Sequence, residues 1–269
     1  MGIERFRFDG KRCVVTGAAS GMGKETAKLL VELGGEVYGL DVAPAIEVDG
    51  LAAAMQVDLK DPASIEDALA GVGGEIHALC SVAGLPGAPF SDLDTITVNF
   101  IGARHLVETA VARSMLPAGA AVGCITSFAG NGWEMQWATV KPLIETPGFD
   151  DAKQWCEANS FGGYGPSKIA MNAYVGWRNV ALLQQGVRIN AIGPGVTQTG
   201  MSQAFVDQMG QDFFDNFPKP IGRDSRAEEQ AYPLVFACSD AASYLSGAVI
   251  YTDGGLGSGI VTGTVSLGG

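Results

Sequence analysis

Short apolar segments alternate with segments of helical periodicity from about residue 11 onward. Ala27, Leu30 and Val31 fall on one face of a helix that should end at the Gly34-Gly35 pair, because glycine favours helix termination. Asp61 and Pro62 are typical of the cap and first turn of another helix. We expect two longer helices at about 95–114 and 165–184, and strands at 13–16, 36–40, 53–57, 78–82, 121–126, 188–192 and 248–252.

This regular alternation of strand and helix predicts the class of fold. Each strand–helix–strand unit crosses over with a right hand, which makes neighbouring strands parallel and leaves helices on both faces of the sheet. The sequence therefore predicts a Rossmann-type α/β fold with a doubly wound, parallel, seven-stranded sheet. Because no repeat or linker interrupts the pattern, we expect a single domain over 1–269.

Composition and charge exclude several classes of partner. Of the 269 residues, 47% are apolar and 17% charged, and a net charge of −12 without any cluster of Lys and Arg argues against nucleic acid. No apolar run is long enough to span a membrane, and the first residues lack the apolar core of a signal peptide. The five cysteines include no C-x-x-C pair, so we interpret them as core residues in a reducing cytoplasm and expect no metal site.

A glycine-rich turn lies between the first expected strand and the first expected helix. It reads TGAASGMG at 16–23, and its glycines permit a tight turn whose N–H groups approach a pyrophosphate at a helix N-terminus. Glycine-rich turns also occur in ordinary loops, but the position in a strand–turn–helix unit favours a dinucleotide site. The residues expected to contact the dinucleotide here are Gly17, Ser20, Gly21, Met22 and Gly23.

An acidic residue at the end of the second expected strand predicts which dinucleotide binds. The carboxylate of Asp41 can accept hydrogen bonds from the adenosine ribose, and it repels a 2′-phosphate. No Arg or Lys stands at the neighbouring positions that would hold such a phosphate. NAD is therefore expected rather than NADP, unless Asp41 is an ordinary loop residue. The further contacts expected on this side are Val42, Asp58 and Leu59.

Tyr164 is the only tyrosine that a lysine follows four residues later, so Tyr164 and Lys168 share one face of an expected helix. A free phenol has a pKa of about 10, which is too high for a base at neutral pH. A nearby ammonium group and an oxidised nicotinamide both favour the phenolate and lower that pKa toward the working range. The pair therefore predicts proton transfer by Tyr164 beside a hydride transfer.

Taken in order, these segments resemble the short-chain dehydrogenase/reductase family over about 10–258. The resemblance rests on TGAASGMG (16–23), Asp41, SVAG (81–84), VNFIG with Asn99, Ser127, YGPSK (164–168), PGVTQT (194–199) and TDGG (252–255). It implies that Lys168 also binds the nicotinamide ribose, that Ser127 binds the substrate oxygen, and that Asn99 holds a water molecule in a proton relay.

The resemblance also implies a second group of cofactor contacts. These are Ala83, Gly84, Pro194, Gly195, Thr197 and Thr199, with the two threonines at the nicotinamide carboxamide. One position departs from the family: Ser81, after the fourth expected strand, stands where the family usually has Asn. That Asn mainly steadies the sheet, so Ser81 puts local order in doubt more than chemistry.

Two variable segments lie beside these motifs. The long insertion at about 128–163 holds Trp133, Trp137 and Trp155, and the substrate loop at about 200–220 holds Phe205, Met209, Phe213, Phe214 and Phe217. Apolar residues beside a catalytic group favour a hydrophobic alcohol or ketone that is alicyclic, aromatic or steroid-like. We expect the loop to line the pocket. The insertion either lines the pocket as well, with at least one tryptophan reaching the substrate, or forms a subunit contact or its own small core.

The insertion and the short span between Asp41 and Asp58 are similar to those of bacterial 3α-hydroxysteroid dehydrogenase/carbonyl reductase relatives. The resemblance implies a homodimer or homotetramer, with subunit contacts through the helices at 95–114 and 165–184. Two other functions stay open on the sequence. One is an NAD-binding regulator without turnover, which usually lacks the Tyr or the Lys. The other is an NAD-using lyase or epimerase, which typically has a longer chain.

Overall fold

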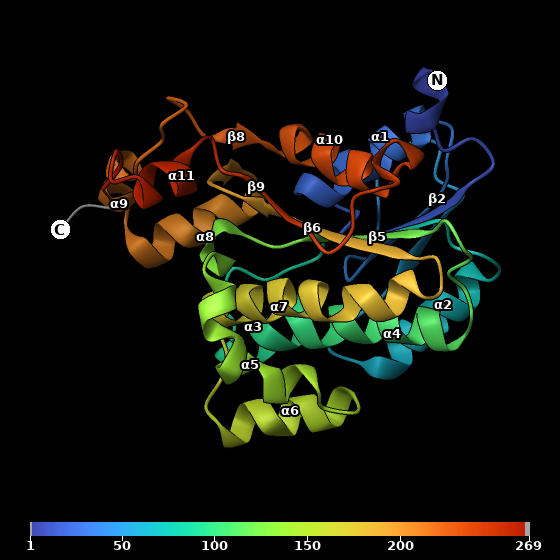
Figure 1. Cartoon of the computed structure of the whole chain (residues 1–269), viewed down its shortest axis with the longest axis horizontal. Helices are drawn as coiled ribbons and strands as arrows, with labels where there is room; N and C mark the ends of the chain where they lie inside the picture. Colours follow the sequence, from blue (N-terminus) through green and yellow to red (C-terminus); the bar gives the residue numbers. More distant parts are fainter. Residues whose placement is uncertain (1, 267–269) are drawn as a thin grey trace.

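The structure is a computed structural model that describes residues 2–266, with Phe213 described by its backbone alone. Its centre is one parallel sheet in the order β3-β2-β1-β4-β5-β6-β9, which confirms the predicted seven-stranded α/β fold (Figure 1). The strands are β1 (Arg12–Thr16), β2 (Glu36–Asp41), β3 (Ala53–Gln56), β4 (Ala78–Ser81), β5 (Ala121–Ile125), β6 (Arg188–Pro194) and β9 (Val249–Thr252). A separate short pair joins β7 (Thr197–Gln198) to β8 (Ser225–Arg226).

Helices cover both faces of the sheet (Figure 1). One face carries α1 (Gly21–Glu32) and α10 (Ala227–Cys238), and the other carries α2 (Pro62–Val72), α4 (Ala103–Ala112) and α7 (Tyr164–Leu183). All residues of β4, β5 and β6 are buried, because each of these central strands has a helical layer on both sides. Two apolar cores result, one beneath each layer of helices.

Local signals in the sequence fix several helix ends as expected. The side chain of Asp61 accepts a hydrogen bond from the Ala63 N–H, with Pro62 as the first residue of α2. The first helix, α1, ends at Glu32, and the chain turns at Gly34 with a φ of +89°. A side chain is strained at such a φ, so glycine suits this position.

The helix expected at 95–114 differs from the expectation in its start and in its winding. It begins at Asp92, because Ser91 caps it by accepting a hydrogen bond from the Asp94 N–H. The run consists of α3 (Asp92–Ile96), a π-helical turn η2 (Thr97–Gly102) and α4. In η2, Gly102 packs against the Leu59 carbonyl so closely that a Cβ would collide with it. The wider π turn contains Asn99, one of the predicted catalytic residues.

The insertion folds into short helices on the outer side of α7 (Figure 1). They are η3 (Phe128–Gly130), η4 (Trp133–Gln136), α5 (Trp137–Ile144) and α6 (Phe149–Ala158). One buried cation fastens them to the domain: Arg104 in α4, 5% exposed, donates hydrogen bonds to the carbonyls of Leu143, Ile144 and Gly148 and to the Thr146 hydroxyl. The acceptors lie in the last turn of α5 and in the segment that leads from it to α6, so Arg104 determines how the insertion turns.

All five cysteines are free and buried, as the core interpretation predicts. Burial raises the pKa of the Cys124 and Cys156 thiols to about 12, so these groups are poor nucleophiles. Within residues 2–266, no helix has both the length and the apolar character needed to cross a membrane.

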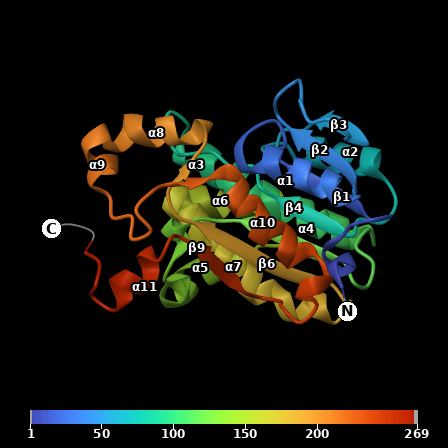
Figure 2. The same cartoon turned by 90° about the horizontal axis from the view of Figure 1, so that it is seen from above.

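Three further helices gather at the end of the molecule away from the N-terminus (Figure 2). They are α8 (Gly200–Met209), α9 (Gln211–Asn216) and α11 (Leu256–Val261). The insertion covers part of α7, while Trp177, Val180 and Leu183 on that helix stay exposed. Assembly as a homodimer or homotetramer stays a prediction.

Replacing Arg104 with Met should lower the free energy of unfolding by about 2–4 kcal/mol, because several buried acceptors lose their donor at once. Urea denaturation measures this change. Arg113→Met, at the exposed end of the same helix, is the control and should cost less than about 1 kcal/mol. Equal losses in the two variants would contradict the anchoring role of Arg104.

Candidate active site

A cavity of about 810 Å³ lies at the carboxyl ends of the central strands. The loops that follow β1, β2, β4, β5 and β6 all contribute to its wall, as expected for an open parallel sheet. Among the predicted catalytic and cofactor-binding residues, every one except Asn99 lines it: Gly17, Ser20, Gly21, Met22, Gly23, Asp41, Val42, Asp58, Leu59, Ala83, Gly84, Ser127, Tyr164, Lys168, Pro194, Gly195, Thr197 and Thr199.

The glycine-rich turn is shaped by close backbone contacts. A Cβ on Gly17, whose φ is +73°, would lie 2.9 Å from Ala83 Cα, and a Cβ on Gly23 would collide with the Gly17 carbonyl. The Thr16 hydroxyl accepts hydrogen bonds from the N–H groups of Val82 and Ala83, which ties the turn to the end of β4. The chain thus presents the N-terminus of α1 to the cavity over a turn in which Gly17, Gly21 and Gly23 carry no side chain, which fits a pyrophosphate.

Asp41, the last residue of β2, has its carboxylate fixed by backbone donors. Its Oδ2 accepts from the Ala19 N–H at 2.9 Å, and its Oδ1 accepts from the Ala43 N–H at 2.9 Å. Each carboxylate oxygen keeps a second lone pair, so both can still accept from the hydroxyls of a ribose. Val42 beside it is 62% exposed and carries no charge.

Three of the four predicted catalytic side chains lie in the loop after β5 and on α7. Ser127 follows β5, and its hydroxyl accepts from the Ala129 N–H at 3.1 Å. Tyr164 is the first residue of α7, and Lys168 follows one turn later. The Lys168 Nζ lies 5.3 Å from the centre of the Tyr164 ring and 3.5 Å from the Ile125 carbonyl, to which it donates. Phenol, hydroxyl and ammonium groups therefore share one part of the cavity.

The pKa values of this group differ from the expectation based on sequence. Burial raises the pKa of Tyr164, although a hydrogen bond with Ser127 acts in the opposite direction. Burial lowers the pKa of Lys168 to about 8, because Lys168 is 4% exposed and the charged form loses its hydration. In the protein alone, desolvation thus outweighs the lowering of the Tyr164 pKa that we expected from Lys168.

Asn99 lies behind the cavity wall. Its side-chain amide donates to the Leu85 carbonyl at 3.0 Å and to the Ser167 hydroxyl at 3.1 Å, and its Oδ1 accepts from the Leu85 N–H at 2.6 Å. The side chain therefore holds the segment that follows SVAG. Ser81 in that motif is the last residue of β4, within the strand expected at 78–82.

The segment after β6 carries the two threonines predicted to contact nicotinamide. The Thr197 hydroxyl lies 2.7 Å from the Ser225 hydroxyl and 3.1 Å from the Gly195 carbonyl, to which it can donate. Thr199 caps α8, and its N–H donates to the Ser202 hydroxyl at 2.9 Å. This helix cap fixes the start of the substrate loop at the rim of the cavity.

The side of the cavity formed by the substrate loop is apolar. Among the residues expected there from the substrate loop, Phe205, Met209, Phe214 and Phe217 line it, and the side chain of Phe213 lies outside the described part of the chain. The Phe205 ring meets the Tyr164 ring edge-on, with ring centres 4.9 Å apart. Phe90, Phe128, Met201 and Leu256 complete this wall. Of these, Phe90 and Leu256 carried no motif or periodicity by which the sequence could identify them.

The tryptophans of the insertion do not reach the cavity. Trp133, Trp137 and Trp155 pack against the apolar core to which α7 contributes, and there the Trp133 ring covers Gly176 and Trp155 meets Phe161 edge-on. None of the three is among the described residues that line the cavity. The hypothesis that one of them contacts substrate is therefore wrong in this structure, because α5 and α6 lie on the far side of α7.

Comparison with known proteins agrees with this arrangement. Residues 11–139 match the family model described as short chain dehydrogenase, and residues 151–257 match the one described as Enoyl-(Acyl carrier protein) reductase. Coniferyl-alcohol dehydrogenase from Pseudomonas sp. (strain HR199 / DSM 7063) is 31% identical, with 92% of this chain and 97% of that one covered. The 3-alpha-hydroxysteroid dehydrogenase/carbonyl reductase of Comamonas testosteroni is 29% identical over 90% and 95%.

A solved structure is also similar over nearly the whole length. It is the 3-alpha-hydroxysteroid dehydrogenase from Pseudomonas sp. B-0831 complexed with NADH, with a TM-score of 0.79, 26% identity, and 95% of this chain and 100% of that one covered. Together with the sheet order, the glycine-rich turn and the group around Tyr164, these likenesses show that the chain belongs to the short-chain dehydrogenase family.

Proposed function

We propose that this protein is an NAD-dependent oxidoreductase that interconverts a secondary alcohol and a ketone on a hydrophobic substrate. One observation carries the proposal: a single cavity joins a glycine-rich dinucleotide cradle, the group of Ser127, Tyr164 and Lys168, and an apolar wall. Support also comes from the two relatives described above, which are an alcohol dehydrogenase and a hydroxysteroid dehydrogenase/carbonyl reductase. In this proposal residues 1–269 act as one dinucleotide-binding and catalytic domain.

The cofactor is held by four parts of the cavity in this proposal. The N-terminus of α1 binds the pyrophosphate, and Asp41 binds the adenosine ribose. Lys168 binds the nicotinamide ribose, and Thr197 and Thr199 bind the carboxamide. When bound, NAD supplies the acceptor for the hydride that leaves the carbinol carbon. Support for NAD over NADP comes from the carboxylate of Asp41 and the uncharged, exposed Val42 beside it.

The protein moves the proton. Tyr164 in its phenolate form accepts the proton of the alcohol hydroxyl in the oxidation direction and returns it in the reduction direction. Ser127 donates a hydrogen bond to the substrate oxygen as negative charge develops there. Because burial alone raises the pKa of Tyr164, the phenolate needs a positive charge beside it; protonated Lys168 and the oxidised nicotinamide ring would supply it.

The apolar wall selects the substrate class in this proposal. Phe90, Phe205, Phe214 and Phe217 present ring surfaces to the space next to Tyr164. Such a surface gains free energy from burying hydrocarbon, and it offers little to a heavily hydroxylated ligand. An alicyclic, aromatic or steroid-like ketone fits this wall.

Changing Tyr164 to Phe should lower kcat at least about a hundredfold, because the proton carrier is lost. NADH affinity, measured by fluorescence titration, should stay within about twofold, because the cradle remains. A screen of hydrophobic alcohols with NAD, followed by NADH absorbance, supplies the substrate. Tyr232→Phe on the exposed face of α10 is the control. A Tyr164→Phe enzyme with more than about a tenth of the wild-type rate would place the proton transfer elsewhere.

Wild-type kcat/KM should be at least about tenfold higher with NAD than with NADP, which corresponds to about 1.4 kcal/mol. Combining Asp41→Asn with Val42→Arg should move the preference toward NADP. Asn removes the charge but keeps an acceptor for the Ala19 N–H, so the turn is preserved. Asp41→Asn alone is the control for the added arginine. Comparable efficiency of the wild type with both cofactors would be incompatible with the assignment of Asp41.

Lys168→Met should raise the free energy of unfolding at pH 7 by about 2 kcal/mol, although it removes activity. The folded-state pKa of about 8 lies below the ordinary lysine value of 10.5, so the cost of burying the cation is present in full below pH 8. Wild-type stability therefore rises between pH 8 and about 10.5, and the advantage of the variant shrinks over that interval. Denaturant titrations across this pH range measure the difference, with Lys153→Met as the control. A variant less stable than wild type at pH 7 would contradict the interpretation.

A further inference from the structure

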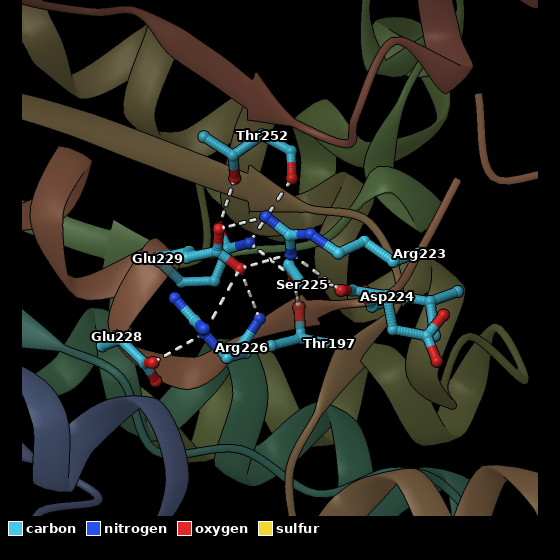
Figure 3. Close-up of polar contacts among 10 residues, drawn as sticks. Thr197, Arg223, Asp224, Ser225, Arg226, Glu228, Glu229 and Thr252 are labelled. Carbon is cyan, nitrogen blue, oxygen red and sulfur yellow. Dashed lines mark hydrogen bonds and ion pairs between the residues drawn. The ribbon is translucent and has the colours of Figure 1, made fainter. Parts of the chain in front are cut away.

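A buried chain of hydrogen bonds runs behind the predicted nicotinamide contact Thr197. It links Thr197 in β7 to Ser225 in β8, Ser225 to Gln230 in α10, and Gln230 to Thr252 at the end of β9. Figure 3 shows Thr197, Ser225 and Thr252 of this chain, with the charged residues around them. These hydrogen bonds thus connect β7, which precedes the substrate loop, to β8, which follows it, and both to the central sheet.

Gln230 is held in one orientation. The side chain is 1% exposed. The Thr252 carbonyl can only accept a hydrogen bond, so the amide nitrogen must be the atom that lies 3.5 Å from it, and the same nitrogen donates to the Ser225 hydroxyl at 2.8 Å. The amide oxygen accepts from the Thr252 hydroxyl. Reversing the amide would place two acceptors face to face at the Thr252 carbonyl.

This orientation determines how the Thr197 hydroxyl can act. Because Ser225 already accepts from Gln230, the single Ser225 proton goes to the Val196 carbonyl at 3.2 Å or to Thr197 at 2.7 Å. The Thr197 proton then goes to the Gly195 carbonyl or to Ser225. Turning the Thr197 proton toward the cavity would remove this donor from the Gly195 carbonyl. Thr197 therefore presents lone-pair density to the cavity and acts as an acceptor.

An ion-pair frame keeps the serine in place. Arg223 donates to both carboxylate oxygens of Glu229 at 2.6 and 2.7 Å, and the Arg226 N–H donates to the same carboxylate at 2.9 Å (Figure 3). Glu229 neighbours Gln230 in α10, and Ser225 lies between the two arginines in sequence. The frame thus holds β8 against the start of α10, so the short distance from Ser225 to Gln230 is maintained.

We propose that Gln230 is a positioning residue which, through Ser225, holds Thr197 as the hydrogen-bond acceptor for the carboxamide NH₂ group of the nicotinamide ring. This inference rests on the proposed function, since it assumes that the cavity binds NAD. Gln230 itself does not line the cavity, so its effect on the ligand passes through the other two hydroxyls.

A dinucleotide that lacks the NH₂ group tests the proposal directly. In 3-acetylpyridine adenine dinucleotide a methyl group replaces that NH₂, while the carbonyl oxygen and the rest of NAD are kept. Calorimetric titration of the wild type should give a dissociation constant about fivefold lower for NAD than for the analogue, which is the usual net value of one hydrogen bond. Thr197→Val should reduce this ratio to about one, because the acceptor is removed.

Gln230→Met and Ser225→Ala should both reduce the ratio to below about twofold, mainly by weakening NAD binding. Ser225→Ala removes a single oxygen and serves as the second test if Gln230→Met does not fold. Gln154→Met, on the exposed face of α6, is the matched control and should keep the wild-type ratio. If Gln230 had a purely structural role, Gln230→Met would weaken the binding of both dinucleotides by the same factor.

The outcomes separate the two proposals. An unchanged ratio in Ser225→Ala and in any folded Gln230→Met, or a wild-type ratio retained by Thr197→Val, overturns the positioning role while the proposed function stands. A wild type that binds neither NAD nor the analogue overturns the proposed function and the positioning role together.

Discussion

Parallel strands that stop at one edge of the sheet are the constraint on which this site depends. Thr16 lies opposite Leu40, Ser81 opposite Cys124, and Ile125 opposite Ile192, so the loops that follow these strands leave the sheet in a row. Side chains alternate between the two faces along a strand, and a slip of one residue would turn Asp41 away from the glycine-rich turn. The register therefore positions the dinucleotide cradle and the catalytic group at the same time.

The buried polar groups of the molecule fall into two kinds. Arg104 has lost its hydration, but four acceptors in the insertion replace the lost water. Lys168 is equally buried, yet within the described residues a hydrogen bond is found only to the Ile125 carbonyl, at 3.5 Å. The first arrangement stabilises the fold. The second leaves a cation poorly solvated beside a phenol, which costs stability and is typical of groups kept for chemistry.

Reasoning from the sequence predicted those features of the fold that local signals determine. The strand–helix alternation was sufficient for the sheet, and Asp61 and Gly34 were sufficient for helix ends, because their physical causes are local. The residues expected at the cavity were identified from motifs that lie at or just after the ends of strands. The tryptophans of the insertion were harder to place. Their apolar surface showed that they would be covered but did not show by which residues. For Trp133 the covering contact is a long-range one with Gly176.

The same limit explains the remaining differences. Asn99 was identified, but its hydrogen bonds to Leu85 depend on a π-helical turn for which the sequence carries no simple signal. In the protein alone the pKa of Tyr164 is raised, because desolvation depends on how completely the folded chain buries the phenol, with Phe205 against its ring. The lowering expected from Lys168 together with oxidised nicotinamide stays a prediction. Gln230 carried no motif, and only the folded chain brings it to Ser225.

The pairing of β7 with β8 has a consequence for how such an enzyme can diversify. The two ends of the stretch that carries α8 and α9 are joined to each other by the pairing of β7 with β8. The stretch is therefore attached to the domain at one place. Chain length within a closed loop adds little to the entropy of closure, and residues there can be exchanged, added or removed at small cost. Phe205, Phe214 and Phe217 of the aromatic wall lie on this replaceable part, whereas Tyr164 and the cradle lie on the sheet and α7. New substrate preferences can therefore evolve by exchange of one peripheral module, without a change in the reaction.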